Sequence, residues 1–341
     1  MRALVLHKAG ELRFDEYDSA EPGPGEVVVR MAAGGICGSD LHYYAHGGFG
    51  AICVREPIVL GHEVSGYVEQ VGDSVEGLNP GQLVSVSPSQ PCMHCDQCNI
   101  GLVNHCADMR FLGSAMRFPH VQGAFREQMT IAASQCVPCD GLTPGAAALA
   151  EPLAVCLHAA THAVELAGRD VLITGCGPIG ILMVSVARHL GAARVVATDV
   201  TDFALSIAAD AGADEQVNVA RDHGVLRSGP RFDLHFECSG APGVIGSVVP
   251  AMKPCARIVQ VGFGGDSELP FAAMTAKELE LRGSFRFRNE FPQAVRLLQS
   301  DAINAEALVT QSFRPEQASL AFETAQDRSR AMKVQFAFNV D

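Results

Sequence analysis

Residues 170–180 read Asp-Val-Leu-Ile-Thr-Gly-Cys-Gly-Pro-Ile-Gly. The first five residues predict a short buried strand, and the stretch 179–190 that follows the turn predicts a helix. Between the two, Gly175, Gly177 and Gly180 have the spacing G-x-G-x-x-G. These glycines allow a tight turn, the approach of a pyrophosphate to the backbone, and close packing of the helix on the strand. In this context the motif, with Pro178 and Ile179 at the helix start, predicts a dinucleotide site.

The sequence after this motif continues the same alternation. Strands are predicted at 194–199, 232–237 and 256–261, and a helix at 203–211. Strands that alternate with helices indicate a doubly wound parallel sheet covered on both faces. We therefore assign the chain to the α/β class and residues 152–284 to a dinucleotide-binding domain.

Asp199 ends the second of these strands, about 20 residues after the last glycine. An acid in this position can accept hydrogen bonds from the hydroxyls of an adenosine ribose. The next residues, Val200, Thr201 and Asp202, include no cation that could hold a 2′-phosphate. We therefore expect NAD to be preferred over NADP, which stays an alternative.

The remaining sequence, residues 1–151 and 285–341, has a different texture. Short β-type runs such as 26–30 and 81–86 are separated by turns rich in Gly and Pro. This pattern predicts an antiparallel, barrel-like β domain. The alternating segment 333–338 predicts a strand that returns to this domain from the C-terminal end of the chain.

Composition sets the wider limits. The 341 residues, 48% hydrophobic and 18% charged, suit two packed domains and exclude a disordered chain. The net charge of −13 makes nucleic acid an unexpected partner, and without a run of 18 apolar residues no membrane span is expected. Charges interrupt residues 1–14, so no secretory signal is expected. Twelve cysteines then favour a cytoplasmic protein with metal ligands and free thiols over disulfides.

Four of these cysteines lie close together. Cys92, Cys95, Cys98 and Cys106 form the run C-x2-C-x2-C-x7-C within a lobe near 90–107. Four thiolates satisfy zinc in a closed tetrahedral site, which has a structural role because no coordination position stays open. An iron–sulfur cluster and metal-free buried thiols are the alternatives.

A second candidate set is dispersed along the chain. It contains Cys37, the neighbours His62 and Glu63, and Glu151. One thiolate, one imidazole and one or two carboxylates can hold zinc and leave a position open for chemistry. Each residue alone is weak evidence, because a single buried Cys or a His-Glu pair is more often structural.

Taken together, these motifs resemble the zinc-dependent medium-chain alcohol/polyol dehydrogenase family. The resemblance covers nearly the whole chain and rests on four segments in the family's order: 37–40, 61–63, the four-cysteine lobe and 175–180. It implies a GroES-like β domain and a Rossmann domain with the active site between them. It also implies two zinc ions per chain, one catalytic and one structural, and a homo-oligomer, either a dimer or a tetramer.

The resemblance implies roles for the dispersed residues. Cys37 and His62 would bind the catalytic zinc, and Asp40 would orient His62. Glu63 would ligate the metal or lie just behind it. Glu151 would contact the metal directly or through water.

The resemblance also implies how the proton of the alcohol leaves. Ser39 and His42 lie in the same segment as Cys37. In the family a hydroxyl and an imidazole at these positions pass the proton outward through a ribose hydroxyl of the cofactor. We therefore expect Ser39 and His42 to form this relay.

Within the family, segments such as 108–116 and 281–287 most resemble members that oxidise L-idonate reversibly to 5-keto-D-gluconate. An aldonate carries a carboxylate, which an acidic protein must hold with dedicated cations. The family's polyol members often have Arg-Tyr where this chain has Arg286 and Phe287, which weakens a direct sorbitol assignment. The expected substrate contacts are Arg286, Arg110, Arg117 and Tyr44.

Three alternatives stay open. The nearest is another zinc enzyme that oxidises sorbitol, xylitol or threonine. A zinc-free reductase of the same fold is disfavoured because such chains lack Cys37, His62 and the lobe cysteines. A non-catalytic NAD-binding module is the most remote, because it predicts degraded metal ligands and this chain keeps them.

Overall fold

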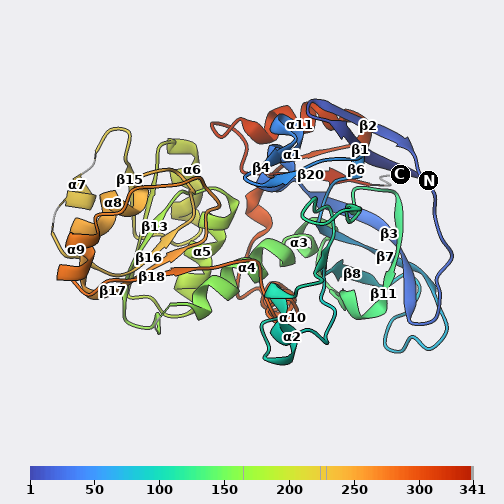
Figure 1. Cartoon of the computed structure of the whole chain (residues 1–341), viewed down its shortest axis with the longest axis horizontal. Coiled ribbons are helices and arrows are strands. Elements are labelled where there is room, and N and C mark those ends of the chain that lie inside the picture. The colour runs from blue at the N-terminus through green and yellow to red at the C-terminus, as the bar shows by residue number, and fades with distance from the viewer. Residues whose placement is uncertain (164, 223, 228, 339–341) are drawn as a thin grey trace.

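The computed structural model describes residues 1–163, 165–222, 224–227 and 229–338. Two lobes lie side by side along the long axis of the molecule (Figure 1). One is built on a six-stranded sheet and the other on a seven-stranded sheet. The predicted α/β class is confirmed, since one lobe carries a parallel sheet and the other a largely antiparallel one.

The nucleotide-type lobe contains the strands β13 to β18 in the order β15-β14-β13-β16-β17-β18, all paired in parallel. Their bounds are Asp170–Thr174 (β13), Arg194–Asp199 (β14), Glu215–Asn218 (β15), Phe232–Glu237 (β16), Met252–Gln260 (β17) and Glu280–Gly283 (β18). The helices are Ala150–Thr161 (α4), Pro178–His189 (α5), Asp202–Asp210 (α6), Gly224–Arg227 (α7), Val244–Val248 (α8), Phe271–Ala276 (α9) and Phe291–Gln299 (α10).

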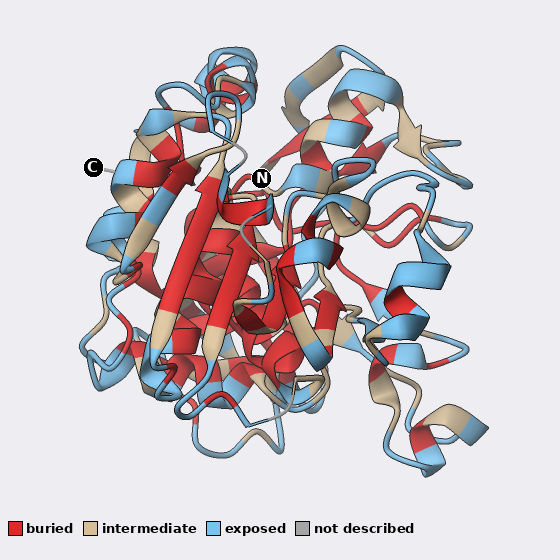
Figure 2. Cartoon of the chain, turned by 90° about the vertical axis from the view of Figure 1, so that its left-hand side faces the viewer, coloured by how far each residue is buried: buried red, intermediate tan, exposed pale blue. Residues whose placement is uncertain are grey.

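Three of the predicted strands, at 170–174, 194–199 and 232–237, are confirmed residue for residue. The apolar residues of each strand are buried, as a strand covered on both faces requires (Figure 2), although β16 also contains Asp233, His235 and Glu237. The strand predicted at 256–261 begins earlier, at Met252, because Met252 already pairs with Phe232 before the register shifts. The middle of this sheet is therefore specified by its own sequence.

The other lobe is built around a seven-stranded sheet in the order β12-β8-β7-β3-β20-β19, with β11 paired to β3. These strands are Glu26–Gly35 (β3), Glu63–Val71 (β7), Leu83–Val86 (β8), Gln128–Ala132 (β11), Cys136–Pro138 (β12), Val309–Phe313 (β19) and Lys333–Ala337 (β20). The remaining strands are Arg2–Lys8 (β1), Glu11–Glu16 (β2), Gly48–Phe49 (β4), Ile52–Cys53 (β5), Ile58–Val59 (β6), Ser89–Gln90 (β9) and Arg110–Phe111 (β10). The helices are Gly38–His46 (α1), Asp96–Asn99 (α2), Pro144–Ala147 (α3) and Ala318–Gln326 (α11).

The C-terminal strand β20 pairs antiparallel with β3, so the predicted return strand is confirmed. This pairing places Lys333, at the start of β20, close to the end of β3 and the start of β7, which are paired through Gly35 and Glu63. Residues about 300 positions apart in the chain thereby come into contact. In the described part of the chain, no helix has the length and apolar character that a membrane crossing needs.

Candidate active site

Three of the dispersed candidates meet. The ligand atoms of Cys37, His62 and Glu63 all lie within 4.8 Å of one another. Cys37 is the N-cap of α1, and Glu63 is the first residue of β7. The pairing of β3 with β7 brings them together, because β3 ends two residues before Cys37 and β7 begins directly after His62. A thiol, an imidazole and a carboxylate in contact are a donor set that suits zinc.

Asp40 fixes the geometry of this group. Its buried carboxylate accepts hydrogen bonds from the backbone N–H of Cys37 (2.9 Å) and of Gly61 (3.3 Å). Its Oδ1 also lies 3.9 Å from Nδ1 of His62, which is buried and has no hydrogen-bond partner within the described residues. Nδ1 of His62 therefore faces Asp40, and Nε2 is the nitrogen that stays available for a metal.

Glu63 has a partner that the sequence analysis missed. The ammonium of Lys333 donates to both carboxylate oxygens of Glu63, at 2.8 and 2.7 Å, and to the carbonyl of Ile36 at 3.2 Å. Both side chains of the ion pair are 2% exposed. Burial alone would lower the pKa of Lys333, but the charges of Glu63 and Cys37 raise it. A lone lysine far along the chain gave no local signal of this role.

Glu151, in the first turn of α4, faces the same group. Burial raises its pKa to about 8; the charge of His62 lowers the pKa, and the charges of Glu63 and Cys37 raise it. Burial and the charge of Glu63 also raise the pKa of the Cys37 thiol to about 12. A buried thiol beside several carboxylates is costly to ionise without a cation, so the group has the chemistry of a metal centre.

The predicted proton relay lies on one face of α1. Ser39 is partly buried in the first turn, and His42, one turn later, is exposed. The His42 ring lies 5.7 Å from the ring of Phe49, which in turn lies 5.5 Å from that of Phe263 in the other lobe. The predicted relay residues therefore lie between the metal group, which consists of Cys37, His62 and Glu63, and solvent where the two lobes touch.

Arg286 lies next to the metal group. Its guanidinium lies 4.0 Å from the ring centre of Phe111 and 4.9 Å from that of Phe285. The Phe111 ring also contacts His62, with the ring centres 5.5 Å apart. Burial lowers the pKa of Arg286 to about 10, while the charge of Glu151 raises it. Its φ of +54° is rare for a residue with a side chain, and such conformations concentrate at functional sites.

The other predicted substrate contacts lie elsewhere. Arg117 forms an ion pair with Asp108 on an exposed loop, and Arg110 is exposed in the short strand β10. The ring of Tyr44 packs against Phe322 of α11, with the ring centres 4.9 Å apart. Among these predicted contacts, Arg286 is the residue that the structure brings to the metal group.

The neighbouring Tyr43, in contrast, interacts electrostatically with Asp40 and Arg286. Its buried phenol oxygen accepts a hydrogen bond from the backbone N–H of Ala115 at 3.1 Å. Burial raises the pKa of Tyr43, as does the charge of Asp40, whereas the charge of Arg286 lowers it. Because Tyr43 and Tyr44 are adjacent, the sequence alone does not indicate which of the two side chains faces inward.

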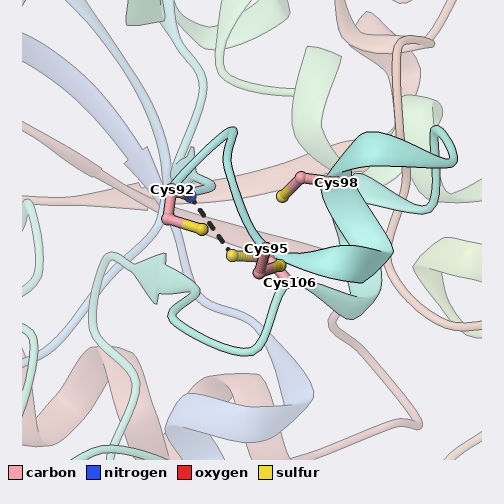
Figure 3. A group of neighbouring side chains, drawn as sticks. All are labelled: Cys92, Cys95, Cys98 and Cys106. Atoms are coloured by element: carbon pink, nitrogen blue, oxygen red, sulfur yellow. Dashed lines mark hydrogen bonds between the residues drawn. The ribbon is translucent and has the colours of Figure 1, made fainter.

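The four lobe cysteines converge from one loop and the short helix α2 (Figure 3). Their sulfur atoms all lie within 4.8 Å of one another. A zinc ion bound at about 2.3 Å by four sulfurs separates them by about 3.8 Å, so the cluster has the dimensions of a closed zinc site. The lobe also contacts the segment that contains Arg286. Asn104 donates to the carbonyl of Phe285 at 2.9 Å and accepts from Arg288 at 3.1 Å.

The glycine-rich turn has the features that a pyrophosphate needs. Gly175 has a φ of +84°, and a Cβ on Gly180 would lie 1.8 Å from the carbonyl oxygen of Gly175. Gly177 is the N-cap of α5, and no described side chain caps this helix. The N–H groups of its first turn are therefore free for an anion. Pro178 and Ile179 occupy that first turn.

Two basic side chains near this turn were missed by the sequence analysis. Arg328, from the C-terminal part of the chain, lies 3.0 Å from the position that a Cβ on Gly177 would take. Arg221 lies 2.7 Å from Asp202. The sequence argument considered only residues 200–202, whereas Arg221, 19 positions beyond Asp202 in the chain, folds back to pair with Asp202.

Asp199 itself is held in place by the turn. Its carboxylate accepts from the backbone N–H of Cys176 (2.7 Å), Val200 (2.7 Å) and Thr201 (2.9 Å). At the end of β16, the buried Glu237 accepts from the backbone N–H of Gly240 at 2.9 Å. These two carboxylates fix the loops that follow β14 and β16, the two strands on either side of β13, at the edge of a parallel sheet where ligands bind.

Comparison with protein families agrees with this geometry. Residues 23–141 match the alcohol dehydrogenase GroES-like domain, and residues 178–300 match the zinc-binding dehydrogenase domain. The chain is 44% identical to L-idonate 5-dehydrogenase (NAD(P)(+)) of Escherichia coli K12, over 92% of each protein. It is 36% identical to human sorbitol dehydrogenase, over 94% of this chain and 92% of that protein.

A solved structure gives the same relationship in three dimensions. The crystal structure of L-idonate 5-dehydrogenase from E. coli superposes with a TM-score of 0.94 at 41% identity. The match covers 99% of this chain and 98% of the other. Both lobes are therefore arranged as in that enzyme.

Proposed function

Because the chain belongs to the zinc-dependent medium-chain alcohol/polyol dehydrogenase family, we propose that it oxidises the C5 hydroxyl of L-idonate reversibly to 5-keto-D-gluconate. The observation that carries the proposal is the contact among Cys37, His62 and Glu63 with Arg286 beside them. The metal group suits a secondary alcohol, and the guanidinium suits the carboxylate that distinguishes an aldonate from a neutral polyol.

The metal donors of this chain have separate tasks. Cys37 and His62 hold the catalytic zinc in the proposal, with Glu63 and Glu151 as the acidic ligands or near neighbours. When bound, zinc supplies electrostatic stabilisation of a developing alkoxide, and NAD supplies the hydride acceptor. Asp40 keeps the imidazole of His62 in one orientation by facing its Nδ1.

The alcohol proton leaves along α1 in this proposal. The hydroxyl of Ser39 accepts this proton as it gives its own proton, through a ribose hydroxyl of the cofactor, to the exposed imidazole of His42, which releases a proton to solvent. Arg286 meanwhile binds the carboxylate and aligns C5 with the acceptor. The aromatic rings of Phe111 and Phe285 next to its guanidinium keep this side chain ordered.

The two cofactors follow from the two halves of the site. We propose two zinc ions per chain, the second held by the four lobe cysteines, where it stabilises the segment that anchors Phe285. We propose NAD on the glycine-rich turn, with Asp199 favouring it over NADP. Arg221 is neutralised by Asp202 and gives NADP a weaker alternative site.

We also propose a homo-oligomer. The strand β18 forms one edge of the parallel sheet, and all four of its residues are exposed. Strands of parallel sheets are usually buried, so this exposure is unusual. An exposed strand edge offers unpaired backbone groups to a second copy of the chain. Light scattering measures the mass directly. The expected cytoplasmic location stays a prediction.

Substitution of Arg286 tests the substrate assignment. We expect Arg286→Met to lower kcat/KM for L-idonate about 50-fold, because a charge-assisted hydrogen bond to the carboxylate is lost. The loss for sorbitol is expected to stay within a few-fold. Arg117→Met is the matched control, because Arg117 is an exposed arginine paired with Asp108.

The assay uses L-idonate, sorbitol, xylitol and threonine with NAD and with NADP, before and after treatment with a chelator. Equal losses on L-idonate and sorbitol would contradict the carboxylate role of Arg286. Turnover that survives complete removal of zinc would contradict the mechanism. Sorbitol as the preferred substrate would favour the second candidate, which the 36% identity to sorbitol dehydrogenase supports.

A further inference from the structure

The metal group contains an internal cation. Lys333 lies at the start of β20 and is 2% exposed. Its ammonium donates to Ile36 O and to both oxygens of Glu63, so its three N–H groups are all used. Ile36 directly precedes Cys37, and Glu63 directly follows His62. The lysine is therefore bonded to both segments that supply the metal donors.

The carboxylate of Glu63 occupies space that is free because residue 35 is a glycine. Gly35 pairs with Glu63 across β3 and β7. A Cβ on Gly35 would lie 2.3 Å from Oε2 of Glu63, so any larger residue would push the carboxylate away. Gly35 does not have a left-handed conformation, so a glycine is needed here for space and not for backbone freedom.

The charges in this group affect how strongly a metal ion can bind there. The charge of Glu63 acts on Cys37, Asp40 and Glu151, so negative charge accumulates within this group. Lys333 supplies one positive charge to the same space, and it is bonded to the oxygens that Glu63 would offer to a metal ion. Two cations that share one carboxylate compete for it, because each weakens the attraction of the other.

We propose that Lys333 is a positioning residue of the metal centre, which competes with the catalytic metal for Glu63. Glu63 then stays a weak donor, the metal is held mainly by Cys37 and His62, and a coordination position is left for the substrate alcohol. This inference rests on the proposed metal assignment of Cys37 and His62.

Removal of the lysine charge tests the competition. In Lys333→Met the carboxylate of Glu63 is free for the metal, so we expect the catalytic zinc to bind about tenfold more tightly. The KM for the alcohol should rise by a similar factor, while the KM for NAD stays unchanged. Lys333→Arg, which keeps the charge, should stay close to wild type in both properties.

Zinc affinity is measured on the full-length enzyme by competition with a chelator, and cobalt(II) substitution reports the donors through its absorption spectrum. Lys253→Met is the matched control, because Lys253 is also paired with acidic side chains, Asp170 and Asp233, but in the other sheet. It should leave the affinity and the spectrum unchanged. Gly35→Ala, which displaces Glu63, should change the cobalt spectrum in the opposite direction to Lys333→Met.

The outcomes separate the two proposals. A wild-type enzyme that binds only the lobe zinc would overturn the proposed function and this inference together. Two zinc ions in the wild type, with Lys333→Met binding the catalytic ion no more tightly, would overturn this inference alone. Should Lys333→Met fail to fold, Glu63→Gln with Lys333→Met removes both charges. This double variant should bind zinc no more tightly than wild type, and tighter binding would contradict a role for Glu63.

Discussion

The two halves of the candidate active site are built in opposite ways. The nucleotide turn uses eleven consecutive residues, 170–180, and offers mainly backbone N–H groups. The metal group gathers side chains from Cys37 to Lys333, and nearly all of them carry charge. A backbone site depends on shape and tolerates no added atom, whereas a side-chain site depends on the balance of charges. The two halves should therefore fail in different ways when they are changed.

The largest expected effect is in the metal group. Cys37→Ser removes the sulfur donor, and we expect activity to fall at least about a thousandfold, because metal stabilisation of the alkoxide is worth several kcal/mol. NAD affinity should stay unchanged, because the nucleotide turn is untouched. Steady-state kinetics, zinc content and NAD titration check this.

The matched control for this change is Cys98→Ser in the lobe. We expect it to lose the other zinc ion and to lower the thermal stability, because a structural zinc contributes directly to folding. A Cys37→Ser variant that keeps both zinc ions and normal turnover would contradict the assignment.

Next in size is a change of shape in the nucleotide turn. Gly180→Ala places a Cβ 1.8 Å from the backbone oxygen of Gly175, so the turn must open. We expect NAD affinity to fall about a hundredfold and the melting temperature to fall as well. Fluorescence titration with NADH and thermal denaturation measure the two effects.

Gly177→Ala separates these effects. The nearest atom to its Cβ is the flexible end of Arg328, at 3.0 Å, so we expect NAD affinity to fall with little loss of stability. Gly246→Ala, where the nearest atom lies at 3.6 Å, should change neither property. Normal NAD binding by Gly180→Ala would refute the backbone site.

The smallest effect concerns a buried polar group without a charge. His235 lies in the middle of the parallel sheet and bonds Thr174 at 2.8 Å, directly before the glycine-rich turn. Burial lowers its pKa to about 3, from an ordinary value of 6.5. The unfolded chain binds the proton first as pH falls, so the stabilising contribution is complete above pH 6.5 and is lost progressively toward pH 3.

We therefore expect His235→Gln to remove about 2–3 kcal/mol of the stability difference between pH 7 and pH 4.5. Chemical denaturation at both pH values measures it. His7→Gln is the control, because His7 is partly exposed and paired with Asp15. An unchanged pH dependence in His235→Gln would show that His235 is not held neutral.

Much of the fold could be predicted because its signals are local. The strands 170–174, 194–199 and 232–237 are each predicted by the residue pattern of one short segment, and the lobe cysteines lie within 15 consecutive residues. The metal donors Cys37, His62 and Glu63 were only a weak candidate set from their residue types, and the resemblance to a family assigned their roles. Tyr44 was named where its neighbour Tyr43 is the buried ring, because helix orientation is set by packing.

The sequence by itself determined the strands in the middle of the parallel sheet, the glycine-rich turn and the cysteine cluster, because the signal for each lies within one short stretch of the chain. Only the tertiary structure placed Lys333 on Glu63, Arg328 beside Gly177 and Arg221 beside Asp202. Such contacts have no sequence period, since a charged side chain far along the chain is paired only after the strands that carry it have packed. The choice of electrostatic partners in both halves of the site therefore belongs to the fold.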